Sequence, residues 1–169
     1  MSVDHQSTWV LGLQGWVVER RGVRVEGETL VLPVKRKRGQ GYRCSRCGEG
    51  VLFAYDHLAP RLIRDFPWAG RPCALEVTLA RVECPACHAT AVEATGWAEP
   101  YGRQTERYER YVAGLCSLMP ATDVAELEGL DKTTVYRIDK KWLERREALR
   151  PDHPVMRMGI DEIAIRRGQ

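Results

Sequence analysis

The chain has 169 residues, of which 44% are hydrophobic and 29% charged, and its formal net charge is +3. This is the composition of a globular protein that folds in water, with room for one ordinary domain or for two to three small ones. No run approaches the roughly 18 apolar residues of a membrane helix, and the start, Met-Ser-Val-Asp-His-Gln-Ser, has no basic and apolar regions of a signal peptide, so we expect no membrane partner and a reducing cytoplasmic location.

The N-terminal part of the chain predicts β-structure. Short runs rich in β-branched and aromatic residues alternate with glycine and charged residues, which is typical of strands and hairpins. These runs lie at residues 9–13, 16–18, 23–27 and 29–34. We assign residues 1–40 to a β-rich N-terminal segment.

A basic run follows this segment directly. Between Lys35 and Arg46 there are six basic residues and no acid, with Tyr42 among them. A solvated loop is the ordinary interpretation of such a run, but basic residues beside a metal-binding turn are also suited to phosphate groups. We therefore name as candidate DNA-binding residues Lys35, Arg36, Lys37 and Arg38.

Two Cys-x-x-Cys pairs are the most informative pattern in the chain. Four thiolates in two tight turns meet the needs of one tetrahedral zinc ion, so we predict a structural zinc ribbon over residues 41–100 with the ligands Cys44, Cys47, Cys84 and Cys87. The 36 residues between the pairs exceed the usual spacing of about 15 to 20, so some of them must form strands or a projecting loop.

Other uses of these cysteines stay open at the level of sequence. An iron-sulfur cluster and a redox dithiol are the alternatives, and His88, which follows Cys87, is a possible substitute ligand. Cys73 and Cys116 fall outside the two pairs and are expected to be small buried hydrophobic residues.

Between the cysteine pairs, the pattern predicts one irregular turn and one strand. The turn covers residues 65–72, which contain two prolines and a glycine, and the strand covers residues 74–82 and leads to Cys84. Near residue 100 the period of the apolar residues changes from two to about 3.6, which indicates a domain boundary.

Residues 101–148 predict a helix-turn-helix unit of three helices. The first helix starts at Thr105 and ends at Pro120. A short second helix is capped by Thr122 or Asp123, Gly129 ends it, and Asp131 caps a third helix. Its inward residues are Val135 and Ile138, which pack against the second helix near Ala125.

The third helix is the candidate recognition helix. In a helix-turn-helix, the N-terminal part of this helix enters the major groove of DNA, whereas later basic residues contact the backbone. The outward residues are Lys132, Thr133, Tyr136, Arg137, Lys140 and Lys141. A helical hairpin of a bundle with a polar face is the alternative.

The last segment, residues 149–169, predicts a linker and then a strand at 155–165. Two acids, Asp161 and Glu162, interrupt this largely apolar strand, and an inward carboxylate needs a partner, for which a divalent metal is a common choice. The residues alone therefore predict an α+β chain of several modules, ending in one strand.

These features together resemble the ISL3 family of bacterial insertion-sequence transposases. The resemblance rests on the order of the two cysteine pairs, the Pro-Trp-Ala-Gly-Arg-Pro segment, Pro-Tyr-Gly-Arg at 100–103, the helix-turn-helix and the segment Gly159–Gly168. It implies that the last strand is the first strand of an RNase H-like catalytic domain and that Asp161 is the first acid of an Asp-Asp-Glu triad. Complete triads of this kind bind two Mg²⁺ ions and act on phosphodiesters.

The chain supplies one of the three triad acids, since the other two are expected far downstream. We therefore expect a truncated transposase that binds double-stranded DNA at the terminal inverted repeats of its element, needs zinc, and performs no strand transfer alone. A homo-oligomer or the full-length transposase is a further possible partner. The alternatives are a transcription regulator with the same two modules and an interaction module that inhibits full-length transposase.

Overall fold

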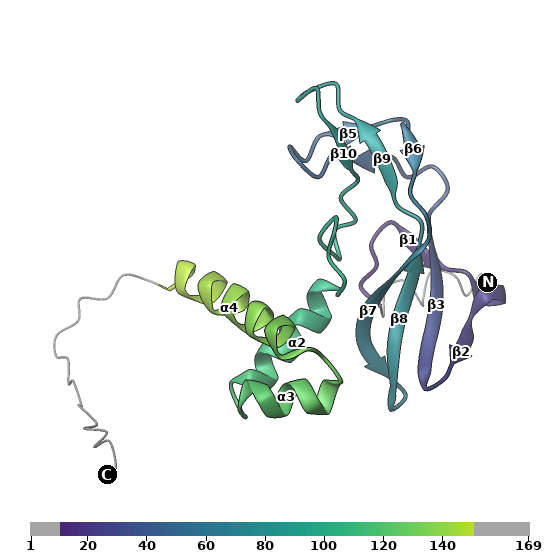
Figure 1. Ribbon diagram of the computed structural model, residues 1–169. Helices are drawn as coiled ribbons and strands as arrows, with labels where there is room; N and C mark the ends of the chain where they lie inside the picture. Colours follow the sequence, from purple (N-terminus) through teal and green to yellow (C-terminus); the bar gives the residue numbers. More distant parts are fainter. Residues whose placement is uncertain (1–10, 151–169) are drawn as a thin grey trace, which may run out of the picture.

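The computed structural model describes residues 11–150, which form a five-stranded sheet, a zinc-ribbon-like unit and a bundle of three helices (Figure 1). The sheet contains β1 (Trp16–Val18), β2 (Arg24–Glu26), β3 (Thr29–Arg36), β7 (Arg61–Trp68) and β8 (Arg71–Val77). The short 3-10 helix η1 (Arg20–Gly22) joins β1 to β2. The predicted strand at residues 155–165, with Asp161, lies outside the described residues.

The long strand β3 organises the sheet. On one side, β1 pairs with its C-terminal half and β2 with its N-terminal half, both antiparallel. On the other side, β8 pairs with β3 in parallel, from Leu30 opposite Cys73 to Val34 opposite Val77, and β7 forms the next, antiparallel strand. A parallel neighbour requires a long crossover, and here the crossover carries the first cysteine pair.

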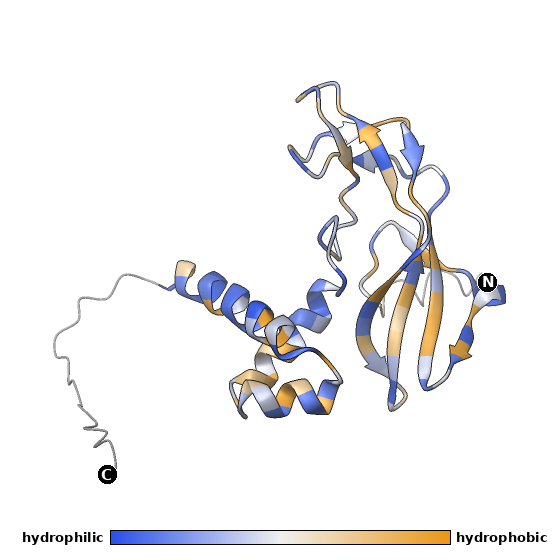
Figure 2. Cartoon of the chain, viewed as in Figure 1, coloured by the Kyte–Doolittle hydropathy of each residue, from blue (hydrophilic) through white to orange (hydrophobic). Residues whose placement is uncertain are grey.

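The core of the sheet combines apolar residues of its strands with residues of the segments around Leu11 and Trp97. Figure 2 shows hydrophobic residues along β3 and β8. Trp16 and Trp97 meet edge to face at 5.7 Å between ring centroids, which joins β1 to the segment that follows the second cysteine pair. The buried side chains are Leu11, Leu13, Leu32, Val34, Ile63, Cys73, Leu75, Val77, Leu79 and Val92. The expected buried role of Cys73 is therefore confirmed, since its side chain is 1% exposed.

The ribbon unit consists of two small sheets. One pairs β4 (Tyr42–Arg43) with β5 (Gly50–Val51), and the other has the order β10 (Thr90–Val92), β9 (Ala80–Glu83) and β6 (Asp56–His57). The segments 1–40 and 41–100 are thus interwoven, because β7 and β8 leave the ribbon and join β3.

Two local expectations between the cysteine pairs are wrong. Residues 65–72 form a β-hairpin, whose turn has positive φ at Ala69 and Gly70, and Pro67 is tolerated because β7 lies at the edge of the sheet. The single strand expected over residues 74–82 is divided into β8 and β9, because the chain passes from the five-stranded sheet to the ribbon at Thr78 and Leu79.

The three helices are α2 (Glu106–Cys116), α3 (Ala121–Glu128) and α4 (Lys132–Ala148). They pack around Tyr108, Val112, Val124, Val135 and Ile138, each with no exposed surface. The capping of α3 differs from expectation: Pro120 takes the N-cap position, and no side chain caps the helix. Thr122 and Asp123 instead lie in its first turn.

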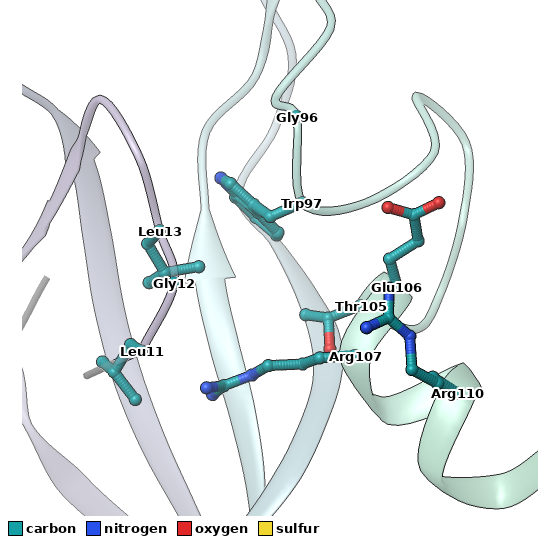
Figure 3. A pocket seen from close by; sticks show the side chains of 9 residues that line it. All are labelled: Leu11, Gly12, Leu13, Gly96, Trp97, Thr105, Glu106, Arg107 and Arg110. Carbon is teal, nitrogen blue, oxygen red and sulfur yellow. The ribbon is translucent and has the colours of Figure 1, made fainter. Parts of the chain in front are cut away.

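A buried carboxylate joins α2 to the sheet. Asp65 on β7 has no exposed surface and accepts hydrogen bonds from the Thr105 hydroxyl at 2.7 Å and from Arg107 Nε at 2.6 Å. Thr105 is also the N-cap residue of α2 and accepts from the Tyr108 N–H. Figure 3 shows Arg107 extending from the start of α2 toward the sheet, below Trp97. Both side chains line a pocket of about 170 Å³. Asp65 therefore fixes both the start and the position of α2.

We expect Asp65→Ala to lower the free energy of unfolding by about 1 to 3 kcal/mol, because the substitution leaves the buried Thr105 hydroxyl and the partly exposed Arg107 guanidinium without their acceptor. Chemical denaturation of the zinc-loaded chain measures this change. Asp56→Ala is the matched control, because its partner Arg81 is exposed and such pairs contribute little. Equal stabilities for the two variants would contradict the assigned role of Asp65.

Candidate metal centre and nucleic-acid interface

The two cysteine pairs lie on turns of the same backbone geometry. In the first turn the Cys44 N–H donates to Glu49 O at 2.9 Å and the Gly48 N–H to Cys44 O at 2.9 Å. In the second turn, Cys84 and His88 make the equivalent bonds at 3.0 and 2.9 Å. Each turn places both of its sulfur atoms on the side that faces the other turn.

The four sulfur atoms are close enough to share one ion. The Sγ atoms of Cys44 and Cys87 are 3.8 Å apart, those of Cys47 and Cys84 are 3.4 Å apart, and all four lie within 4.8 Å of one another. A zinc ion about 2.3 Å from each sulfur requires sulfur separations of about 3.8 Å. The predicted ligand set is therefore brought together, in a geometry that fits structural zinc.

Thiolate is the form that binds metal, and the cluster on its own favours it at one cysteine. The backbone N–H of Cys87, with a smaller contribution from that of Ala86, lowers the pKa of the Cys84 thiol to about 7 although burial opposes this change. A thiol in this range loses its proton near neutral pH. The backbone N–H of Glu49 would lower the pKa of Cys47, but hydrogen bonds to the other cysteines and burial raise this pKa to about 12.

His88 has a backbone role in the second turn. It takes the position of Gly48 in the first turn, with φ of 53° against 79°, and is one of two non-glycine residues with positive φ among residues 11–150. Its side chain is exposed and is not part of the cluster of possible metal ligands. Cys116 also lies outside this cluster and is partly buried on α2.

A buried ion pair connects the metal centre to the sheet. Glu93, which is 1% exposed and forms a β-bridge with Cys44, pairs with the Arg36 guanidinium at the end of β3. The other carboxylate oxygen of Glu93 accepts from the Ala80 N–H at 2.8 Å. The Arg36 guanidinium also lies over the rings of Trp16 and Tyr42, 4.8 and 4.4 Å from their centroids.

This geometry argues against Arg36 as a DNA-binding residue. Its side chain is 17% exposed and has a charged partner inside the protein, so binding to phosphate would have to displace a buried pair. Sequence could not show this, because Glu93 lies 57 positions later in the chain.

The rest of the basic run has a mixed environment. Lys35 pairs with Glu19 on the surface. Arg38 is exposed, Lys37 is partly exposed, and neither has an ion pair within the described part of the chain. Lys37 and Arg38 are therefore the members of the predicted set that are available to a phosphate.

The turn between α3 and α4 has the predicted chemistry. Gly129 adopts the left-handed conformation with φ of 58°, and the Leu130 N–H returns to Ala125 O at 2.9 Å. The Asp131 carboxylate accepts from the Thr133 N–H at 2.8 Å and caps α4. Val135 and Ile138 are buried, as expected, so the orientation of α4 about its own axis is fixed.

This orientation exposes most of the predicted recognition residues. Lys132, Thr133, Tyr136, Arg137 and Lys140 are exposed, and Tyr136 retains 55% of its accessible surface. Arg137 also donates to Gln104 Oε1 at 3.2 Å and lies 3.8 Å from Glu109, so it leans toward one side of the helix.

Lys141 differs from the other predicted residues. Its Nζ lies 2.5 Å from Glu109 and 2.6 Å from Glu99, and its side chain is 18% exposed. Burial alone would lower the pKa of Lys141, but the hydrogen bonds to these two carboxylates raise it above its ordinary value. Lys141 is thus a charged contact between α4, α2 and the segment before α2, which argues against the predicted contact with the DNA backbone.

No helix in the described part of the chain is long and apolar enough to cross a membrane. Asp161, the candidate first triad acid, is outside residues 11–150, so the structure gives no account of its surroundings.

Comparisons with known proteins agree with this geometry. Residues 40–87 match the zinc-finger of transposase IS204/IS1001/IS1096/IS1165, and residues 93–143 match the helix-turn-helix domain of transposase family ISL3. Neither the curated proteins nor the solved structures give a match. The two matched segments together cover more than half of the 169 residues, in the order of the ribbon and the helices, and the chain belongs to the ISL3 family of transposases.

Proposed function

We propose that this chain recognises the terminal inverted repeats of its insertion sequence by placing the N-terminal part of α4 in the major groove of double-stranded DNA. The observation that carries the proposal is the orientation of α4, whose buried residues leave an exposed recognition face of Lys132, Thr133, Tyr136, Arg137 and Lys140. Arginine, threonine and tyrosine can reach base edges or nearby phosphates, and lysine supplies charge to the backbone.

A second region supports binding without sequence preference. Lys37 and Arg38 lie between the end of β3 and the first cysteine turn, on a segment whose ends are fixed by the sheet and by β4. Basic side chains of this kind bind phosphates and release counterions, which stabilises the complex at low salt. The zinc ion fixes the segment at its ribbon end, and the pair of Arg36 with Glu93 holds it to the sheet.

The proposal assigns DNA binding, and not strand transfer, to residues 11–150. Two-metal chemistry on phosphodiesters requires clustered carboxylates. In the described residues, the one group of side chains with metal-binding geometry is the four cysteines. We assign Mg²⁺-dependent catalysis to a complete triad that would include Asp161, and we place the protein at the bacterial nucleoid, with a second copy or full-length transposase as a further partner.

The purified chain should contain about one zinc per molecule, measured by elemental analysis. Cys44→Ser and Cys87→Ser should lose the metal and unfold the ribbon together with the sheet, because binding and folding are coupled and the two units share strands. Trp16 and Trp97 fluorescence and far-UV circular dichroism report this unfolding. Cys116→Ser, which changes a cysteine outside the cluster, is the matched control and should keep its zinc. A folded chain without metal, or one with the visible absorption of an iron-sulfur cluster, contradicts the assignment.

Arg137→Ala should weaken binding to the inverted repeats that flank the gene by about 1 to 3 kcal/mol and reduce discrimination against unrelated DNA. Fluorescence anisotropy on both DNA sequences measures the effect. Arg145→Ala serves as the control on the same helix, since Arg145 pairs with Glu106 at 2.7 Å near the other end of α4. An unchanged affinity for Arg137→Ala, or equal losses for both variants, counts against major-groove recognition by α4.

Arg36 and Arg38, two residues of the basic run, should respond differently to substitution by alanine. Arg36→Ala should lower the free energy of unfolding by about 3 to 5 kcal/mol, because Glu93 remains buried without its partner. Arg38→Ala should leave stability unchanged and lower the slope of log affinity against log salt concentration by about 0.9, the contribution of one phosphate contact. Denaturation curves and salt titrations separate the two effects. A normal stability for Arg36→Ala would show that the buried pair has no structural role.

A further inference from the structure

A loop beside the recognition helix is not used by the function proposed above. Residues 99–104 connect the ribbon to α2 and, with Thr134 and Arg137 of α4, line an open groove of about 510 Å³. We call Pro100–Arg103 the flanking loop. Its Tyr101 retains 75% of its accessible surface, and Arg103 is also exposed.

The backbone of the flanking loop is held in place by the sheet. The Arg61 guanidinium on β7 donates to Pro100 O and Tyr101 O, each at 3.3 Å, and also to Gly102 O. The Arg64 N–H donates to Arg103 O at 2.8 Å. The loop is therefore ordered before any ligand binds, so that binding through it costs little conformational entropy.

The loop lies on a defined side of α4. With 3.6 residues per turn, Thr133, Tyr136 and Lys140 lie opposite the buried Val135 and Ile138, whereas Thr134 lies on the flank toward the loop. Arg137 lies between these two directions and donates to Gln104, which directly follows the loop. A helix about 10 to 12 Å across fills a major groove about 12 Å wide, so an element on its flank faces the phosphates at the groove edge.

The charges in the groove favour an anion. Arg103 has no ion pair in the part of the chain that the structure describes. Glu99 is the one acid that lines the groove, and it is neutralised by Lys141 at 2.6 Å and by Arg145 at 4.0 Å. The hydrogen bond from Lys141 lowers the pKa of Glu99, so this carboxylate stays ionised and paired. Among the described residues that line the groove, Arg103 is thus the unpaired cation, while Arg137, which is held by Gln104 and Glu109, remains about half exposed beside it.

We propose that the flanking loop is a second DNA-contacting element, in which the Arg103 guanidinium binds a phosphate at the edge of the major groove that receives α4 and the Tyr101 ring packs on the neighbouring sugar. This inference rests on the proposed function, because the position of the phosphate follows from the insertion of α4. It adds a fixed contact on one flank of the helix and so determines how α4 is oriented in the groove.

The test is Arg103→Ala in the full zinc-loaded chain, with the terminal inverted repeat as the probe. The slope of log affinity against log salt should fall by about 0.9, which corresponds to about an eightfold weaker affinity at 0.1 M salt. Hydroxyl-radical footprinting should show the loss of protection at sugars on one side of the α4 contact. Arg103→Lys should restore most of the slope, because it keeps the charge.

Arg21→Ala is the matched control, since it removes one exposed arginine on η1, at the sheet edge opposite β7. It should leave the slope and the footprint unchanged. Tyr101→Ala, which removes an exposed side chain, should abolish protection of the same sugars. This variant replaces Arg103→Ala in the test if Arg103→Ala does not fold. Zinc content and thermal unfolding verify that each variant is intact.

Three outcomes overturn the inference in distinguishable ways. If the wild-type chain does not bind the repeats, both the proposed function and the loop contact are wrong. If the wild-type chain binds, but Arg103→Ala and Tyr101→Ala leave the salt slope and the footprint unchanged, the loop contact alone is wrong. If these variants bind DNA normally but self-associate more weakly, as measured by sedimentation, the loop is an interface between copies of the protein.

Discussion

The parallel pairing of β3 with β8 is the constraint on which the rest of the structure depends. The chain leaves the sheet after β3, forms the first cysteine turn, returns through β7 and β8, and leaves again to form the second turn. The four cysteines therefore come together only when the segments before and after the crossover have both paired in the sheet. Conversely, a bound zinc ion ties together the segments on either side of the β7–β8 hairpin and shortens the loop that the sheet must close. The sheet and the metal centre are thus expected to form as one cooperative unit.

Buried carboxylates then join this unit to its neighbours. Glu93 joins the ribbon to β3 through Arg36, and Asp65 joins β7 to the start of α2 through Arg107. Glu128 at the end of α3 accepts from the Tyr108 hydroxyl at 2.9 Å, while Arg64 of β7 donates to its carbonyl oxygen. Such pairs contribute modestly to net stability, because desolvation opposes the attraction between the charges, but a wrong alignment of the modules would leave a charge buried alone. They therefore fix the orientation of the helices relative to the ribbon.

The features that sequence could predict depend on residues close together in the chain. The cysteine turns, the glycine that ends α3 and the Asp131 cap each follow from a few adjacent residues. The features that it missed depend on distant partners or on unusual turns. The β7–β8 hairpin was not predicted, because a proline such as Pro67 is rare within a strand and an alanine such as Ala69 is rare at a positive φ in a turn. The structural roles of Arg36 and Lys141 were hidden because their acidic partners lie 57 and 32 positions away.

These distant pairs also change how the charge of the chain should be interpreted. The net charge of +3 and the number of basic residues count every basic side chain equally, although several are paired with carboxylates inside the fold, including Arg36, Arg107 and Lys141. Those side chains hold the scaffold and are not free to release counterions from DNA. The charge that can act on DNA is instead concentrated at exposed side chains, namely Lys37 and Arg38, the outer face of α4 and Arg103. Because these positions are carried by elements that buried pairs hold in place, a modest net charge is compatible with a well-defined DNA-binding surface.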